Sequence, residues 1–325
     1  IDFTDKSIIN IYIPRRLEKL NEIILNAKKK DVFALKRMKD FEKTAIYAGK
    51  KTEVILVEQS MANLASNNAR QIFNQISGLN IYQNDDAGLQ LHIGGRGLDP
   101  NRTSNFNTRK NGYDISADVL GYPESYYTPP AESLEKIQII RGAASLQYGT
   151  QFGGLVNFIT KRPSRKKTSL SSRNTIGSNQ LLTNFTSLSG TSGKFSYYSF
   201  FNYKKGDGNR ENSEFNSINF FKNFNYKLNS KTKISSEITY MEYLAKQAGG
   251  LTDQMFYEDP FQSNRSRNWF QVQWFVYNLK LDHEFSKKTE FSLSLFGLQA
   301  SRNAVGYRIN RVFQDDPGGV RDLIK

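Results

Sequence analysis

Residues 270–286 read Phe-Gln-Val-Gln-Trp-Phe-Val-Tyr-Asn-Leu-Lys-Leu-Asp-His-Glu-Phe-Ser, and apolar and polar side chains alternate along most of the stretch. The apolar set is Phe275, Tyr277, Leu279, Leu281 and Phe285, and the polar set is Asn278, Lys280, Asp282 and Glu284. Successive side chains of a β-strand point to opposite faces, so this pattern predicts one long strand with an apolar and a polar face. A soluble sheet would bury the apolar face, whereas a pore-forming barrel would turn it toward lipid.

Six further segments of roughly ten residues show the same alternation. They are residues 167–177, 180–190, 194–204, 214–228, 232–244 and 289–302. With 270–286 they make seven predicted strands, each about as long as a tilted strand that crosses a membrane, for which ~9–11 residues are needed.

The connections between these strands differ in length. Short polar turns at 191–194, 229–231 and 286–288 alternate with longer connections at 205–213 and 245–269. Short turns at one end and long loops at the other are typical of bacterial outer-membrane barrels, in which aromatic residues also gather near the strand ends. The 23 Phe, 17 Tyr and 2 Trp residues suit such girdles. The sequence therefore favours a membrane barrel over a soluble sandwich, although core aromatics of a sandwich would look similar.

Composition narrows the function classes. The net charge is +14, but the basic residues are scattered, which favours an anionic ligand or a lipopolysaccharide surface over nucleic acid. The chain has no cysteine and only two histidines, His92 and His283, both predicted to be structural. No acid–base pair or nucleophile constellation stands out, and Asp85, Asp86, Asp315 and Asp316 are interpreted as loop charges. We therefore expect no enzyme, no cofactor and no metal site.

Two further absences bear on the membrane question. No apolar run of about 18 residues is present, so no transmembrane helix is expected. No signal peptide is visible either, and the chain opens in the middle of a pattern at Ile1, so a processed or truncated N-terminus is expected.

The central part of the chain has a different character. Residues 41–165 mix strand-like runs at 54–57, 137–140 and 155–160 with a helical stretch near 62–76. Asn67 or Asn68 could cap that helix, with Ile72, Phe73 and Ile76 on one face. Between Arg96 and Ser133 lies a long polar region with little strand signal.

Residues 137–163 read Ile-Gln-Ile-Ile-Arg-Gly-Ala-Ala-Ser-Leu-Gln-Tyr-Gly-Thr-Gln-Phe-Gly-Gly-Leu-Val-Asn-Phe-Ile-Thr-Lys-Arg-Pro. This segment resembles the end of the plug domain of TonB-dependent outer-membrane receptors. Residues 91–97 and 68–80 resemble two earlier plug elements in the right order. The resemblance implies that Arg141, Gly142, Tyr148, Gly149, Gly153 and Gly154 are structural. Glycine permits positive φ and close backbone approach where the strand turns back.

The resemblance implies a fold class and a domain plan. The fold is a membrane β-barrel of about 22 antiparallel strands, of which the first seven are present, with an N-terminal α/β plug in the lumen. Residues 1–20 resemble the end of the carboxypeptidase-regulatory-like β-sandwich that precedes the plug in many Bacteroidota receptors. Residues 21–40 would hold the TonB box and linker, 41–165 the plug, and 166–325 the truncated barrel.

Function follows from the same resemblance. It implies TonB-dependent import across the bacterial outer membrane, with the N-terminal segment in the periplasm and ExbB and ExbD acting with TonB. The TonB box would be Glu22, Ile23, Ile24 and Leu25, read by strand addition. Residues 96–102 and 129–134 look most like the ferric dicitrate receptor, whereas residues 109–113 depart from the family's usual Val-Asp-Gly strand.

An iron(III) dicitrate chelate is anionic, and arginine provides forked donors for carboxylates. The candidate ligand-binding residues are therefore Arg96, Arg102, Arg109, Arg265, Arg267 and Arg308. Two alternatives remain open. One is import of another cargo, such as a siderophore, haem, cobalamin, or a glycan through a SusC-like receptor with a surface lipoprotein. The other is a soluble carbohydrate-binding β-protein.

Overall fold

The structure is a computed structural model that describes residues 35–307 and 323–324. Short gaps inside this range fall at residues 43–44, 61, 67, 69, 74–75, 77, 84, 90, 96, 120–121, 143–147 and 149–152. All described residues belong to the unit Asp31–Lys325. The predicted β-sandwich end, the TonB box and residues Arg96, Gly149 and Arg308 lie outside the described residues.

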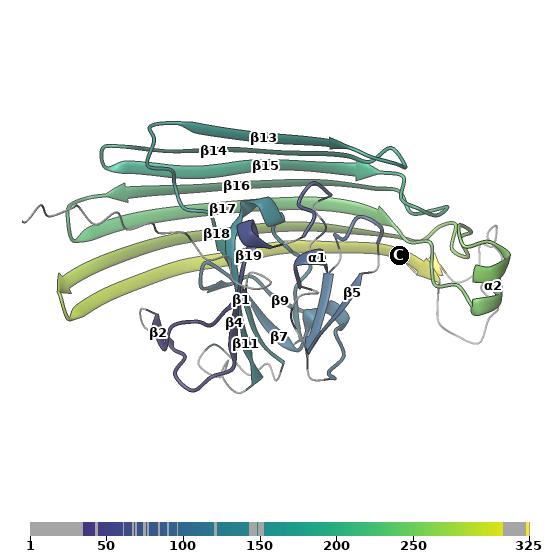
Figure 1. Cartoon of the computed structure of the whole chain (residues 1–325), viewed down its shortest axis with the longest axis horizontal. Coiled ribbons are helices and arrows are strands. Elements are labelled where there is room, and N and C mark those ends of the chain that lie inside the picture. Colours follow the sequence, from purple (N-terminus) through teal and green to yellow (C-terminus); the bar gives the residue numbers. More distant parts are fainter. Residues whose placement is uncertain are drawn as a thin grey trace, which may run out of the picture. The chain divides into compact units, whose positions relative to one another are not determined.

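The last half of the described chain is one antiparallel sheet of long strands (Figure 1). Its strands are β13 (Ser169–Ile176), β14 (Leu182–Ser192), β15 (Phe195–Gly206), β16 (Phe215–Lys227), β17 (Thr232–Lys246), β18 (Trp269–Ser286) and β19 (Thr289–Tyr307), followed by the two-residue β20 (Leu323–Ile324). Each strand pairs with its sequence neighbour. All seven predicted strands are confirmed, with ends that differ by a few residues.

The two ends of this sheet differ in their connections. Residues 193–194, 228–231 and 287–288 form short turns at what we call the turn end. Residues 177–181, 207–214 and 247–268 connect strands at the opposite end, which we call the loop end. The longest of these connections carries the short helix α2 (Asp253–Glu258). The predicted alternation of short turns and longer loops is confirmed.

Residues 35–160 form a mixed sheet with smaller strand pairs around it. The sheet order is β1 (Leu35–Lys36), β4 (Thr52–Leu56), β11 (Leu134–Arg141), β12 (Gly154–Thr160), β7 (Phe106–Lys110) and β8 (Tyr113–Asp114). Only β7 and β12 run parallel. The strand pairs are β2 (Phe41–Glu42) with β3 (Ala45–Ile46), β5 (Leu79–Gln83) with β6 (Leu91–Gly95), and β9 (Ala117–Val119) with β10 (Tyr122–Glu124).

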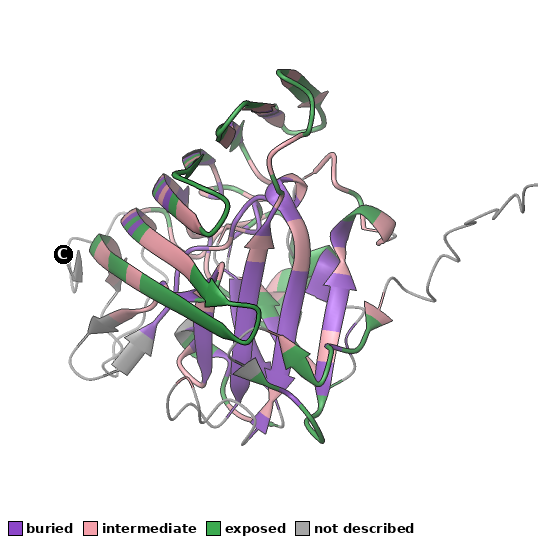
Figure 2. Ribbon diagram, turned by 90° about the vertical axis from the view of Figure 1, so that its left-hand side faces the viewer, coloured by how far each residue is buried: buried purple, intermediate pink, exposed green. Residues whose placement is uncertain are grey.

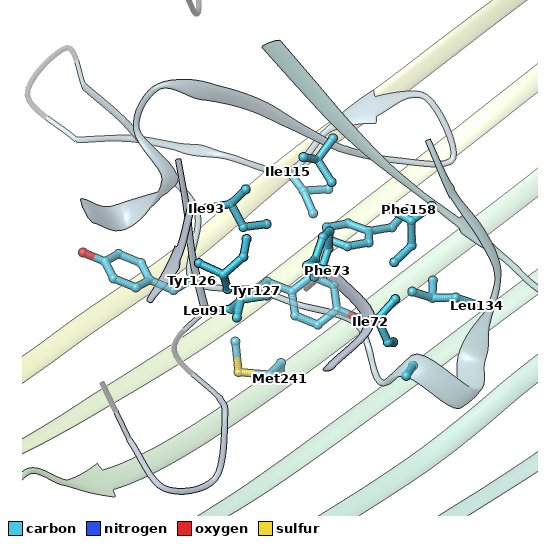
Figure 3. Packing of buried hydrophobic residues seen from close by; sticks show 14 of the residues in the cluster. Ile72, Phe73, Leu91, Ile93, Ile115, Tyr126, Tyr127, Leu134, Phe158 and Met241 are labelled. Carbon is cyan, nitrogen blue, oxygen red and sulfur yellow. The ribbon is translucent and has the colours of Figure 1, made fainter. Parts of the chain in front are cut away.

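This mixed domain packs against one face of the long sheet and shares a core with it. Figure 3 shows Ile72, Phe73, Ile115 and Phe158 gathered above Met241 of β17. The rings of Phe73 and Phe158 meet edge to face at a centroid distance of 6.3 Å. The strands of the mixed sheet are largely buried (Figure 2), whereas β16 and β17 of the long sheet alternate between buried residues and intermediate or exposed ones.

Three features of this domain differ from what the sequence indicates. The helix predicted near 62–76 is only α1 (Arg70–Phe73), although the backbone N–H of Arg70 does donate to the Asn68 side chain, 3.0 Å away. The polar region between Arg96 and Ser133, which shows little strand signal in the sequence, contains the short strands β7 to β10. The mixed sheet already begins at Leu35, inside the predicted linker. Among the described residues of the domain there are also three short 3-10 helices, η2 (Val57–Gln59), η3 (Asn101–Thr103) and η4 (Ala131–Ser133).

No helix among the described residues is long and apolar enough to cross a membrane.

Candidate functional site

The hairpin between β11 and β12 closes on glycines. At Gly154 φ is +130°, and a Cβ there would lie 2.0 Å from the carbonyl oxygen of Ile140. At Gly153 a Cβ would lie 2.6 Å from the carbonyl oxygen of Asn105. No other residue type fits these positions without movement of the backbone, and the structural assignment of both glycines stays a prediction.

Two polar side chains hold the same region together. The Arg141 guanidinium lies 2.6 Å from the Glu53 carboxylate, so its ion pair forms inside the mixed sheet, between β11 and β4. Tyr148 shares a hydrogen bond of 3.0 Å with Tyr47, and its carbonyl oxygen accepts from Asn107 and Arg109. Both residues thus contact the plug-like domain itself rather than the long sheet, and their structural assignment stays a prediction.

A polar network joins the β7–β8 hairpin to the middle of the long sheet. Asn111 and Gly112 form its turn, both with positive φ. The Glu237 carboxylate of β17 accepts hydrogen bonds of 2.8–2.9 Å from Asn111, the Tyr113 hydroxyl and Asn223. Burial, and next the nearby Glu237 charge, raise the pKa of Tyr113 well above its ordinary value, so this hydroxyl remains a donor.

A buried cation lies at the centre of this network. Lys110 is 1% exposed, and its ammonium donates to Thr239 of β17 and lies 4.1 Å from the ring centroid of Phe221. Burial lowers the pKa of Lys110 to about 8, against the opposing effect of the Glu237 charge. Sequence reasoning missed this residue, because a lysine in a polar strand is usually solvated.

Other contacts fasten the domain nearer the loop end. The Asp86 carboxylate accepts from the backbone N–H of Asn209 at 2.5 Å, and Lys204 of β15 donates to the carbonyl oxygen of Ala87. Arg302 of β19 lies 2.9 Å from the Glu124 carboxylate and 2.6 Å from the Tyr126 hydroxyl. The sequence suggested that Asp86 is a loop charge, whereas in the structure its carboxylate also binds the 207–214 loop.

A polar cavity of about 1010 Å³ opens at the turn end, between the domain and the inner face of β16–β19. The Asn111–Gly112 turn, Tyr148, Asn278 and Phe296 are among its lining residues. The β7–β8 hairpin and its Glu237 network form the boundary of this cavity toward the middle of the sheet. The mixed domain therefore covers the inner face near the middle of the strands, and the cavity lies between this contact and the turn end.

The structure places Arg109 at a different end of the sheet from Arg265 and Arg267. Arg109 donates to Asn107, the Gly112 carbonyl and the Tyr148 carbonyl, and it stacks on the Tyr148 ring at 4.7 Å. It therefore lies beside the turn-end cavity, and the structure does not place it with the loop-end candidates. Its pKa is lowered by burial, with opposing effects of Asp114 and two tyrosines.

Arg265 and Arg267 lie in the 247–268 loop at the loop end, where Arg265 donates to the Asn264 carbonyl at 2.7 Å. The same loop is tied to the 207–214 loop by Arg210, which donates to the carbonyl oxygens of Gln262 and Gly249. The Arg102 side chain, like Arg96 and Arg308, is outside the described part of the structure.

Within the described ranges, no group of three His, Asp or Glu side chains is arranged to hold a metal ion.

Comparison with known proteins addresses the identity of these two regions. A family model described as "TonB-dependent Receptor Plug Domain" matches residues 49–155. These residues are a TonB-dependent receptor plug domain. We therefore call the described residues 35–160 the plug and the long sheet β13–β19 the barrel wall.

A curated relative and two solved structures agree with this assignment. The ferric enterobactin receptor PirA of Pseudomonas aeruginosa is 31% identical over 123 residues, which cover 34% of this chain and 16% of PirA. The ferric citrate transporter FecA in its unliganded form has a TM-score of 0.65 at 20% identity, over 81% of this chain and 41% of FecA. The copper transporter OprC gives 0.61 at 14% identity, over 80% of this chain and 39% of OprC.

These likenesses confirm the predicted fold class, a plug with strands of an outer-membrane receptor barrel. The chain spans less than half the length of each of these relatives. The relatives named here are described as receptors or transporters. The Bacteroidota type, the total of about 22 strands and the domain limits outside the plug stay predictions.

Proposed function

We propose that this chain is the N-terminal part of a TonB-dependent importer that carries a ferric chelate, such as iron(III) dicitrate, across the bacterial outer membrane. The proposal rests on one observation, which is that the plug covers the inner face of the barrel wall. The plug core packs on Met241, Val272 and Trp274, while Ile238, Tyr277 and Leu279 on the opposite face of the same two strands are apolar and exposed. A pore closed by a docked domain requires work to open, which is the role of an energised partner.

The cargo proposal rests on chemistry at the loop end. Arg265 and Arg267 lie in the longest loop, and both FecA and PirA are named for ferric chelates. A citrate-bound ferric ion presents carboxylates, which guanidinium groups bind with paired donors. A ferric siderophore is the second candidate, favoured by the 31% identity to the ferric enterobactin receptor over 123 residues.

The partner proposal concerns the N-terminal segment. Glu22, Ile23, Ile24 and Leu25 would pair with TonB by strand addition in the periplasm, with ExbB and ExbD supplying the energy. Deletion of residues 21–27 should abolish import and leave chelate binding intact. Import that persists in this deletion would exclude the segment as the TonB box.

Growth on ferric citrate as sole iron source, with and without the gene, tests the cargo directly. In the complete receptor, Arg265→Ala combined with Arg267→Ala should weaken binding of radiolabelled ferric citrate, whereas Arg162→Ala at the turn-end cavity should not. Ferric enterobactin binding with no ferric citrate binding would favour the siderophore. Loss of neither ligand in the double variant would remove these arginines from the binding site.

A further inference from the structure

The two ends of the barrel wall differ in charge (Figure 1). The described connections at the turn end, together with residues 161–168 before β13, contain nine lysines and arginines and no aspartate or glutamate. The described connections at the loop end contain three arginines, no lysine and six acidic residues. Basic residues that are scattered along the sequence therefore gather at one end of the wall in the structure.

Residues 161–168 belong to the turn end because they lie beside the 193–194 turn. The backbone N–H of Thr191 donates to the carbonyl oxygen of Lys166 at 2.8 Å. The Tyr197 hydroxyl donates to the carbonyl oxygen of Lys167 at 3.3 Å. Every described connection at the turn end thus contributes at least one cation, and the charge forms a row along this end rather than a single pocket.

Most of these cations have no acidic partner. Lys161 and Arg162 pair with Glu58 and Glu135 of the plug, at 3.1 and 3.2 Å. The other seven are exposed and form no ion pair with any described residue. These seven, which we call the turn-end cations, are Arg165, Lys166 and Lys167 before β13, and Lys194, Lys231, Lys287 and Lys288 in the turns.

A layer of aromatic side chains lies next to the turn-end cations on the outward face. The ring of Phe195 stacks on those of Tyr197 and Phe224, at centroid distances of 5.9 and 5.8 Å. Tyr226 pairs with Phe195 and is 46% exposed. The neighbouring Tyr198 points the other way, because its hydroxyl donates to a carbonyl oxygen of the plug. Outward aromatic rings at strand ends are typical of the boundary between hydrocarbon and headgroups.

The cations lie just beyond this aromatic layer. Lys194 directly precedes Phe195, so its backbone is about 3 Å farther along the strand direction. A lysine side chain can extend its ammonium into water while its stem stays on an apolar surface. This places the charge at the depth of lipid phosphates, and cations near such a surface attract anionic lipids. A row of charge along several turns also fits a layer of headgroups better than one compact anion.

We propose that the turn-end cations bind the phosphate groups of anionic phospholipids in the leaflet around the turn end, an inference that rests on the proposed membrane location. In bacterial outer-membrane barrels the short turns lie on the periplasmic side. The loop end carries an excess of acidic residues and repels the same lipids. The two ends of one wall thereby distinguish the two leaflets.

Local quenching of fluorescence by nitroxide lipids tests the proposal. The chain has no cysteine, so Ser230→Cys or Ser178→Cys places one fluorophore at the turn end or the loop end of a complete receptor free of other thiols. The receptor is reconstituted in phosphatidylcholine vesicles that contain either phosphatidylglycerol or phosphatidylcholine with a nitroxide near the top of its acyl chain. At Ser230→Cys the phosphatidylglycerol quencher should be the stronger of the two, and at Ser178→Cys it should not.

Charge variants separate the turn-end cations from the rest of the wall. Lys194→Gln combined with Lys231→Gln should lower the preference for phosphatidylglycerol at Ser230→Cys, because each lysine near an anionic surface strengthens binding roughly fivefold. Lys205→Gln combined with Lys222→Gln is the matched control. It removes the same charge from exposed lysines of β15 and β16 away from the turn end, and should leave the preference unchanged.

The outcomes distinguish this inference from the membrane location. Equal quenching by the two lipids at Ser230→Cys, an equal preference at both ends, or an equal loss in both charge variants would overturn the proposal. Quenching by neither lipid at either site would instead overturn the membrane location on which it rests.

Discussion

The two faces of β18 come from alternate residues of one strand, yet they meet opposite surroundings. Trp274 and Val276 face the plug and are 1% exposed, whereas Tyr277 and Leu279 face away and are 49% and 50% exposed. The indole N–H of Trp274 also donates to the carbonyl oxygen of Ile115 in the plug, at 3.2 Å. In a soluble sheet the continuous apolar face would be the buried one.

The difference shows that the two faces of the strand have different surroundings: one contacts the plug and the other faces away from it. Toward the loop end the inner face is apolar, because the plug core covers it. Toward the turn end it becomes polar, at Asn278, Lys280 and Asp282, where the cavity lies. The outward face carries exposed apolar side chains at Tyr277, Leu279 and Phe285, and it is polar at Gln271 and Gln273 toward the loop end. This distribution fits a lipid-facing wall around a plugged pore.

The largest expected effect concerns the inner face. Glu237→Leu removes the acceptor of Asn111, Tyr113 and Asn223 and leaves Lys110 buried without a countercharge. Removing one partner of a buried charged cluster costs about 3–5 kcal/mol. Hydrogen exchange in the complete receptor should show faster exchange across the β7–β8 hairpin. Glu284→Leu, at the turn-end cavity, is the control, and equal exchange in both variants would contradict the network.

The next effect concerns the outward face. Leu279→Arg should destabilise the receptor in lipid vesicles by about 2–4 kcal/mol, because a guanidinium is costly in hydrocarbon. Lys280→Arg, one residue away on the inner face, should change stability little. Urea unfolding from vesicles measures both variants. A tolerated arginine at Leu279 would show that this face meets water.

A smaller contrast compares two aromatic residues on opposite faces of β18. Trp274→Phe loses the hydrogen bond to Ile115 and part of the packing volume, at a cost of about 1–3 kcal/mol. Tyr277→Phe removes a hydroxyl from an exposed ring and should be nearly neutral. The same urea experiment compares the two. An equal loss of unfolding free energy in the two variants would show that the two faces of β18 do not differ.

The smallest effect is a pH dependence from Lys110. Its pKa is about 8 when buried and about 10.5 when unfolded, so the unfolded chain binds the extra proton between these values. Stability should therefore rise from about pH 8 to about pH 9.5, by at most about 1.4 kcal/mol per pH unit. Lys110→Met should reduce this slope. Because the pKa of Tyr113 and Tyr127 is raised, both stay protonated in the folded protein over this range.

The barrel strands could be predicted from the sequence because their surroundings repeat with period two. In residues 277–282 the outward residues are apolar and the inward residues are polar, so the alternation is visible in the sequence. The glycine pair Gly153 and Gly154 is also visible in the sequence, and close backbone approach at these positions excludes a Cβ.

The plug interior could not be predicted in the same way. In β7, Asn107 and Lys110 are buried polar residues that bond to distant segments, at Tyr148 and Thr239, so the strand shows no apolar alternation. The position of Arg109 beside the turn-end cavity depends on the hairpin turn at Asn111 and on Tyr148, far along the chain. Contacts at long sequence separation leave no local pattern.

Spin labels placed one at a time at residues 275–281 of β18, in the complete receptor in outer-membrane vesicles, test the central claim most directly. Collision with oxygen, which concentrates in lipid, should be high at 275, 277, 279 and 281 and low at the even positions. Collision with a water-soluble nickel complex should be low at the odd positions. High nickel accessibility at the odd positions, or no alternation at all, would contradict a lipid-facing wall around a plug.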